Sequence, residues 1–103
     1  MSMEETTTKY SDVLKDNHII FLNYLKARFP AFHNSNIFFR DFHYAVKNFL
    51  EIKNLKVNYA TSEQLAKEFA EFLEGKGILI KVSDLGWKLN FPDFTTIKSG
   101  DPF

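Results

Sequence analysis

The chain contains no cysteine, which excludes disulfide bonds, cysteine nucleophiles and thiolate metal sites. It has only four glycines, all at or after position 75, so there is no glycine-rich phosphate-binding loop. No apolar run approaches the roughly 18 residues that a membrane-spanning helix needs. The first ten residues, MSMEETTTKY, carry two Glu and no apolar segment, unlike a secretory signal peptide. We therefore expect a soluble cytoplasmic protein that is not bound to a membrane.

Neither sign of charge is in excess, because thirteen Lys and Arg side chains balance thirteen Asp and Glu side chains. The whole molecule has no net field that would draw it to nucleic acid or anionic lipid, so any such binding needs a local patch. Aromatic side chains are abundant, with twelve Phe among 103 residues. A chain of this length forms one domain, and we expect aromatic rings to fill much of its core.

The three histidines show no metal-binding pattern. No two of His18, His33 and His43 have the i, i+4 spacing of a helical ligand pair. No nucleophile is arranged with a base in a recognisable motif. The sequence therefore predicts no metal, no cofactor and no enzymatic activity. His18 lies on an apolar helical stripe and is expected to be a hydrogen-bonded core residue.

Two periodic segments predict the first two helices. Residues 1–10 are polar and are expected to be flexible. From Ser11 to Phe29, apolar residues recur at spacings of three and four, and Pro30 ends this helix. A second helix is predicted from about Asn36. Its buried face is expected to comprise Phe38, Phe42, Ala45, Val46, Phe49 and Leu50.

Ile37 and Tyr44 fall on the opposite side of that second helix, among charged side chains. This position makes them a candidate apolar contact patch for a protein partner. The alternative is that the first helix or the C-terminal tail covers both residues, since single apolar side chains at the surface are common.

The third predicted helix has signals at both ends. Thr61 and Gln64 form a capping-box pattern, and Gly75 is placed to end the helix. Its inward stripe is expected to comprise Leu65, Ala66, Phe69, Phe72 and Leu73.

A β-hairpin is predicted after that helix. Its strands lie within residues 78–83 and 87–91, separated by a short turn. Trp87 is expected to lie in the core, the alternative being an exposed binding anchor. Residues 92–103 have no period and are expected to form an extended tail.

The order of three helices and a hairpin, with the segments LEGKGILIKV (73–82) and GWKLNF (86–91), resembles the winged-helix, or winged helix-turn-helix, superfamily. The first segment is similar to the junction between third helix and wing, and the second to the returning strand. The resemblance implies an α+β, mostly α fold over residues 11–91: a three-helix winged-helix domain with a C-terminal two-stranded β-hairpin wing. Ile78 and Ile80 would enter the core. DEP-type interaction domains have a similar order, and winged helices bind DNA, RNA or protein.

The outward face of the third helix is acidic. It comprises Glu63, Gln64, Lys67, Glu68, Glu71 and Glu74. In DNA-binding winged helices this helix enters the major groove, where four carboxylates against one lysine would repel phosphates. The face is either a solvated surface or a docking surface for a basic protein, in which case Glu63, Glu68 and Glu71 are candidate interface residues.

Positive charge lies on the second helix and the hairpin. The candidate nucleic-acid-binding residues are Arg40, Lys47, Lys67, Lys81 and Lys88. Phosphate contacts from such residues alone give non-specific, salt-sensitive binding. The alternative is that these lysines serve solubility.

Two functions from different classes remain. The resemblance implies a small DNA-binding regulator that binds through the wing and second helix as a homodimer. The residues themselves favour a protein interaction or assembly module that uses the acidic third helix and the patch of Ile37 and Tyr44.

Overall fold

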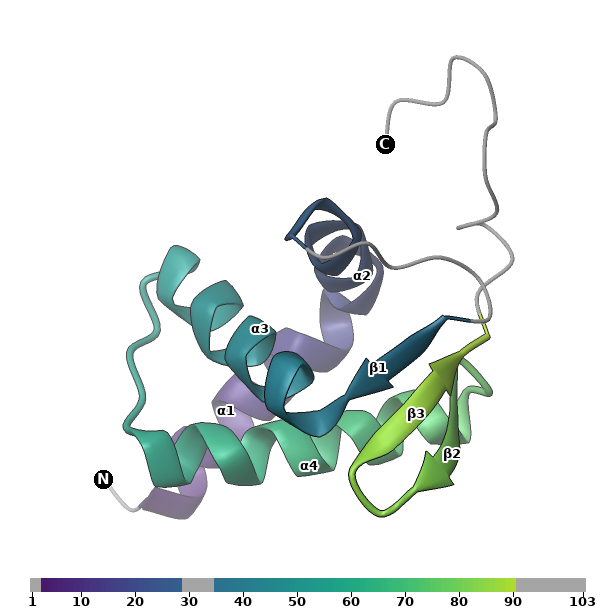
Figure 1. Ribbon diagram of the computed structural model, residues 1–103. Helices are drawn as coiled ribbons and strands as arrows, with labels where there is room; N and C mark the ends of the chain where they lie inside the picture. The colour runs from purple at the N-terminus through teal and green to yellow at the C-terminus, as the bar shows by residue number, and fades with distance from the viewer. Residues whose placement is uncertain (1–2, 29–34, 91–103) are drawn as a thin grey trace.

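The structure, a computed structural model, describes residues 3–28 and 35–90. The elements are α1 (Met3–Asp16), α2 (His18–Arg28), β1 (Asn36–Phe38), α3 (Phe39–Ile52), α4 (Tyr59–Gly75), β2 (Leu79–Ser83) and β3 (Gly86–Leu89). The strands form an antiparallel sheet in the order β1-β3-β2, which lies beside the helices (Figure 1). The predicted α+β, mostly helical class and its hairpin are confirmed. The helices number four in the described residues, not three, and the sheet has a third strand.

A break at Asn17 divides the predicted first helix into α1 and α2, and Figure 1 shows the change of direction there. The backbone N–H of Asn17 donates to Val13 O (3.1 Å), and that of Phe21 donates to Asn17 O (2.9 Å). The i to i−4 pattern thus continues through the break, which is why the apolar period continues as well. The Asn17 side chain also donates to Val13 O (2.8 Å), a local bond that competes with regular helix.

The ends of this helical pair differ from the prediction or lie outside the described residues. α1 begins at Met3, within the segment that was expected to be flexible. Phe29, Pro30, His33 and the predicted tail at 92–103 lie outside the described residues.

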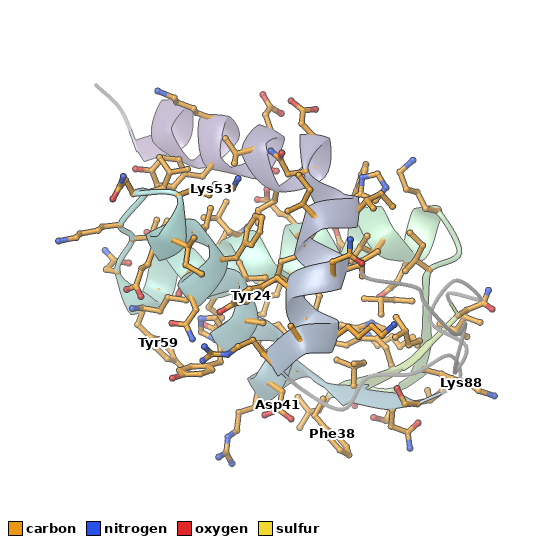
Figure 2. All side chains as sticks on the ribbon, turned by 90° about the horizontal axis from the view of Figure 1, so that it is seen from above. Tyr24, Phe38, Asp41, Lys53, Tyr59 and Lys88 are labelled. Carbon is orange, nitrogen blue, oxygen red and sulfur yellow. The ribbon has the colours of Figure 1, made fainter. Side chains whose placement is uncertain are left out.

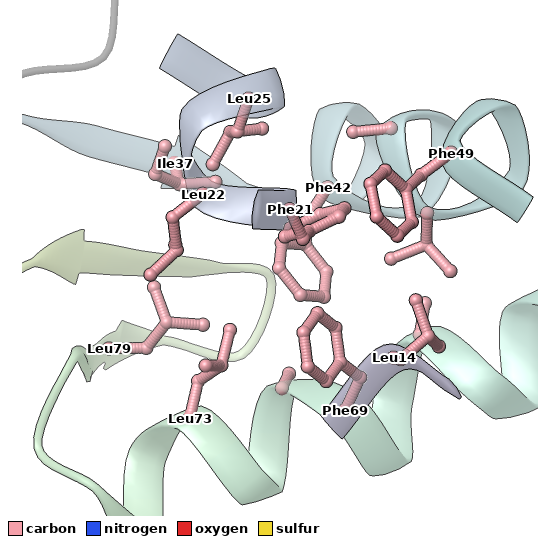
Figure 3. Close-up of a cluster of buried hydrophobic side chains, with 14 of the residues drawn as sticks. Leu14, Phe21, Leu22, Leu25, Ile37, Phe42, Phe49, Phe69, Leu73 and Leu79 are labelled. Atoms are coloured by element: carbon pink, nitrogen blue, oxygen red, sulfur yellow. The ribbon is translucent and has the colours of Figure 1, made fainter. Parts of the chain in front are cut away.

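The core is built around the ring of Phe21, as Figure 3 shows. This ring meets Phe42, Phe49 and Phe69 edge to face, with centroid distances of 5.6, 5.4 and 5.0 Å. Each such pair stabilises a fold by about 0.5–1.5 kcal/mol beyond the burial of its apolar area. The prediction of a core rich in aromatic rings is confirmed.

The second predicted helix starts later than expected. Residues 36–38 form β1, and α3 begins only at Phe39. Because side chains in a strand alternate between two faces, Ile37 points inward and Phe38 outward. Phe38 is 58% exposed, so its predicted place in the core was wrong. The other predicted core positions of this helix are buried: Phe42, Ala45, Val46, Phe49 and Leu50.

Helix α4 forms as predicted but uses different end signals. Its N-cap is Asn58, whose side-chain oxygen accepts from the backbone N–H of Thr61 (2.7 Å). The capping box predicted at Thr61 was therefore wrong, since that residue already lies inside the helix. Gly77, not Gly75, takes the left-handed conformation after the helix, with φ of 77°.

Candidate interaction surfaces

The hydrogen bonds between β2 and β3 determine which backbone groups of β2 remain free. The N–H of Asn90 donates to the carbonyl of Ile78 (2.7 Å). Hydrogen-bonded and non-hydrogen-bonded pairs alternate in an antiparallel ladder, so the next residue of β2 bonded to β3 is Ile80. Leu79 and Lys81 therefore direct their N–H and C=O groups away from β3, toward the open edge of the sheet.

The sheet and its hairpin expose large apolar side chains, which we call the outer sheet surface. Its members are Phe38 (58% exposed), Ile80 (46%), Val82 (58%) and Leu85 (69%). By the strand register Phe38 and Ile80 lie on the outer side of the sheet, while Val82 is at the bulge of β2 and Leu85 is in the hairpin turn. Figure 2 shows Phe38 pointing away from the helices. Four exposed apolar side chains on one small sheet and its turn are more than scattered surface residues account for.

Gly86 lies between Phe38 and the hairpin turn. The two residues are opposite each other in the β1–β3 register. A Cβ atom at Gly86 would lie 3.5 Å from Cδ1 of Phe38 and 3.3 Å from the Ser83 hydroxyl. The contact with Phe38 would be an ordinary van der Waals contact, whereas that with Ser83 would be tight, so the missing side chain mainly makes room for the hairpin turn.

The inner side of the sheet is covered by helices. Ile37 lies opposite Trp87 in the register, and both are buried. The prediction that Ile37 belongs to an exposed patch was wrong because this residue lies in a strand and not in a helix. Trp87 is a core residue as predicted. Leu79 is buried and Ile80 exposed, so the expectation that Ile80 enters the core was also wrong.

The acidic face of α4 points outward as predicted, apart from Glu74, although Glu63 and Glu68 are also half-buried. Glu74 is half-buried, and its carboxylate accepts a 2.6 Å hydrogen bond from the Trp87 indole N–H. The remaining members form what we call the acidic α4 surface: Glu63, Gln64, Lys67, Glu68 and Glu71. In that surface the Gln64 amide donates to Glu68 (3.1 Å). Glu74 thus ties the hairpin to α4 instead of facing a partner.

The outward face of α3 carries Arg40, Tyr44, Lys47 and Glu51 at helical spacing. Tyr44 is 56% exposed, as expected of a surface residue. Lys47 forms an ion pair with Glu51, with 2.9 Å between Nζ and Oε2. Because Ile37 is buried, Tyr44 lacks the neighbour with which it was predicted to form a patch.

The structure does not bring the five candidate nucleic-acid-binding residues onto one face. Arg40 and Lys47 lie on α3, and Lys67 lies within the acidic α4 surface. By the strand register, Lys81 is on the inner side of the sheet and Lys88 is on the outer side. A single duplex surface would therefore not meet all five.

His43 and Ser62 form a buried hydrogen bond between α3 and α4. The Ser62 hydroxyl donates to Tyr59 O (2.8 Å), so its oxygen accepts from Nε2 of His43 (2.7 Å). Burial lowers the pKa of His43 below its ordinary value, Lys47 lowers it further, and Glu63 opposes the shift. A nucleophilic serine needs its hydroxyl proton directed at the base. Here that proton goes to a carbonyl, and Ser62 is fully buried. The hydrogen bond between His43 and Ser62 therefore stabilises the packing of α3 against α4.

His18 lies half-buried at the start of α2. Its Nδ1 lies 2.9 Å from Lys15 O, and its ring meets Phe72 edge to face at 5.5 Å. The predicted hydrogen-bonded histidine is therefore present, at the margin of the core.

The outer sheet surface was not predicted from the sequence because two local signals are weak. Phe38 occupies the N-cap position of α3 without a capping side chain, so no residue marked the true helix start. Strand β1 has only three residues, too few for alternation to stand out. Side chains along β2 alternate between the two faces of the sheet. With Leu79 on the inner face, this alternation could have predicted that Ile80 lies on the outer face.

In residues 3–28 and 35–90, no group of three or more His, Asp or Glu side chains is placed to hold a metal ion. No helix in the same ranges combines the length and apolar character needed to cross a bilayer. Comparisons with protein-family models, curated proteins and solved structures find no match to this chain.

Proposed function

We propose that this chain is a winged-helix binding module, not an enzyme, and that its partner is a protein. The order of elements supports the winged-helix assignment: a broken first helix, a short strand, two helices and a hairpin whose second strand pairs with β1. The absence of cysteine supports a cytoplasmic location.

The observation that carries the proposal is the outer sheet surface. Four large apolar side chains are exposed to solvent and therefore add little to the stability of the core: Phe38, Ile80, Val82 and Leu85. A patch of this kind beside polar residues is typical of a protein contact site. The acidic α4 surface points the same way, because its carboxylates disfavour insertion of this helix into a DNA groove.

Two double variants of the full chain test the proposal. The wild type is used to capture a protein partner, and the affinity of that partner for the wild type and each variant is then measured by titration. Val82→Ser with Leu85→Ser removes two members of the outer sheet surface. Ile19→Ser with Ile20→Ser is the matched control, since both residues are exposed on α2. We expect loss of partner binding in the first variant only, with both melting curves close to that of the wild type. Equal loss in the control, or no loss in either, would contradict the proposal.

Nucleic-acid binding is a second candidate, favoured by the charge of the hairpin. Residues 76–90 contain three lysines, Lys76, Lys81 and Lys88, and a single acidic residue, Asp84. Among the described residues, Lys81 and Lys88 form no ion pair, which leaves both ammonium groups available to phosphates. If this candidate is correct, the protein binds DNA as a homodimer and α4 does not enter the major groove.

Fluorescence anisotropy of labelled random duplex DNA at low and moderate salt separates the two candidates. Phosphate binding predicts a steep loss with salt, about 0.9 in logarithmic slope for each phosphate neutralised. It also predicts loss on changing Lys81→Glu and Lys88→Glu, but not Lys56→Glu, an exposed control outside the hairpin. Salt-independent binding, or none, would exclude the phosphate mechanism.

A further inference from the structure

The open edge of β2 offers backbone groups to another strand. Within the described residues β2 pairs only with β3, and the N–H and C=O groups of Leu79 and Lys81 point away from it. The register shifts between Lys81 and Ser83, and such a bulge ends regular pairing. The stretch from Leu79 to Lys81 is therefore the part of the edge that can pair regularly.

The side chain in the middle of this edge is apolar and lies on the outer face of the sheet. Ile80 is exposed next to the open edge, between Leu79 and Lys81. A strand added to an antiparallel sheet places alternate side chains beside those of its neighbour. Ile80 thus favours β-branched or other apolar residues at the positions of an added strand that share its face.

On the other face the edge carries a positive charge. Lys81 lies on the inner side, opposite Trp87, yet its side chain is exposed because β2 is the last strand. Lys76, at the C-cap of α4, and Lys88, on the outer side of β3, add positive charge nearby, against Asp84 alone in residues 76–90. A carboxylate opposite Lys81 on an added strand would complement this charge, whereas another lysine would be repelled.

A second copy of the chain fits this edge poorly. Pairing two β2 strands antiparallel would join their free groups as Lys81 with Lys81, as Lys81 with Leu79, or as Leu79 with Leu79. The last register overlaps the two strands at Leu79 only, because Lys81 would lie opposite Gly77, outside β2. The first register sets like charges opposite each other, and the second sets a lysine against a leucine without a counter-charge. An inward-pointing lysine on an edge strand is a common device against self-pairing.

We propose that the edge of β2 binds an extended acidic segment of a partner protein by adding it as a fourth strand. Apolar side chains of the segment contact Ile80, and a carboxylate pairs with Lys81. This inference rests on the proposed protein-binding function and names the kind of segment that is recognised.

The test uses labelled synthetic peptides titrated into the full chain by fluorescence anisotropy. One peptide alternates valine and glutamate, a second alternates valine and lysine, and a third is the first with N-methylated backbone amides. We expect the glutamate peptide to bind, the lysine peptide to bind about tenfold more weakly, and the N-methylated peptide to lose binding. The amide hydrogens of Leu79 and Lys81 should exchange more slowly when the glutamate peptide is bound.

Charge reversal supplies the control. Lys81→Glu should invert the preference so that the lysine peptide binds more tightly, while Lys67→Glu, on the outward face of α4, should leave it unchanged. Absence of glutamate-peptide binding, or equal binding of the N-methylated peptide, would overturn the inference. So would a dimer in sedimentation that protects the same two amides, because a second copy would then occupy the edge.

The outcome separates this inference from the proposed function. If the peptides fail while Val82→Ser with Leu85→Ser still abolishes binding of a protein partner, only the mode of recognition is wrong. If that double variant leaves partner binding intact, the proposed function itself fails.

Discussion

Ile37 and Phe38 are neighbours in β1, and both are large and apolar, yet they meet opposite environments. Ile37 is 6% exposed against the helices, whereas Phe38 is 58% exposed on the outer sheet surface. Both sides of this small sheet carry large apolar side chains, but only the inner side is covered by helices, and the outer side also carries Asn36 and Lys88. Burial explains the apolar residues of the inner side through stability. It does not explain those of the outer side, which is why we propose that they bind a partner.

The largest effect is expected on the covered side, at Trp87. Changing Trp87→Ala should lower the free energy of unfolding by about 3–5 kcal/mol, because it leaves a cavity against Phe42 and Phe39. Urea denaturation measures the change in the free energy of unfolding. Trp87→Phe is the control that keeps a ring but removes the hydrogen bond to Glu74, and it should cost less. A small effect of Trp87→Ala would show that the inner side is not packed as described.

The two residues of β1 provide the sharpest test of the comparison. Ile37→Ser should lower the free energy of unfolding by about 3 kcal/mol, since it removes buried apolar atoms and places a hydroxyl among apolar neighbours. Phe38→Ser should change it by about 0.5 kcal/mol or less, because the ring is mostly exposed. Thermal unfolding of both variants measures the difference. If the order were reversed, the strand register would be wrong by one residue.

These two residues also show how far sequence reasoning reached. The periodic helices, the aromatic core and the hairpin were predicted because each rests on many residues of one pattern. The register of β1 was not, because three residues beside a helix without a capping side chain carry no local signal. That error exchanged the roles of Ile37 and Phe38. It therefore affected the candidate site more than the fold, since a contact surface depends on single residues.

A third test concerns pH, because His43 is a titratable group buried between α3 and α4. Its pKa lies below the ordinary 6.5, chiefly through burial, so the unfolded chain takes up a proton first as the pH falls. This contribution to stability is full above about 6.5 and is lost below that pH, with a slope of at most about 1.4 kcal/mol per pH unit.

Urea unfolding of the wild type and of His43→Gln across a pH series measures this term. Glutamine can still bond to Ser62 but does not titrate in this range. The stability difference between the two proteins should shrink as the pH falls. A difference that stays constant with pH would show that His43 is protonated as readily in the fold as in the unfolded chain.

At Tyr24, in the helical part of the core, a substitution is expected to raise stability. Its hydroxyl oxygen is buried and has no hydrogen-bond partner among the described residues, while its ring packs on Phe49 at 5.7 Å. Tyr24→Phe keeps the ring and removes the unpaired hydroxyl, so it should raise the free energy of unfolding by up to about 1 kcal/mol. Denaturant unfolding is the measurement. A loss of stability would mean that this hydroxyl has a partner in solution.

The smallest effect on stability is expected at the tip of the hairpin. Leu85 is 69% exposed, so Leu85→Ser should change the free energy of unfolding by about 0.5 kcal/mol or less. The backbone carbonyl of Leu85, which accepts from the N–H of Phe39 (2.8 Å), is unaffected by the substitution. The variant should instead remain soluble at higher ammonium sulfate concentration, because it exposes less apolar surface. A marked loss of stability would mean that Leu85 is covered in solution, and the outer sheet surface would then belong to the fold instead of to a partner.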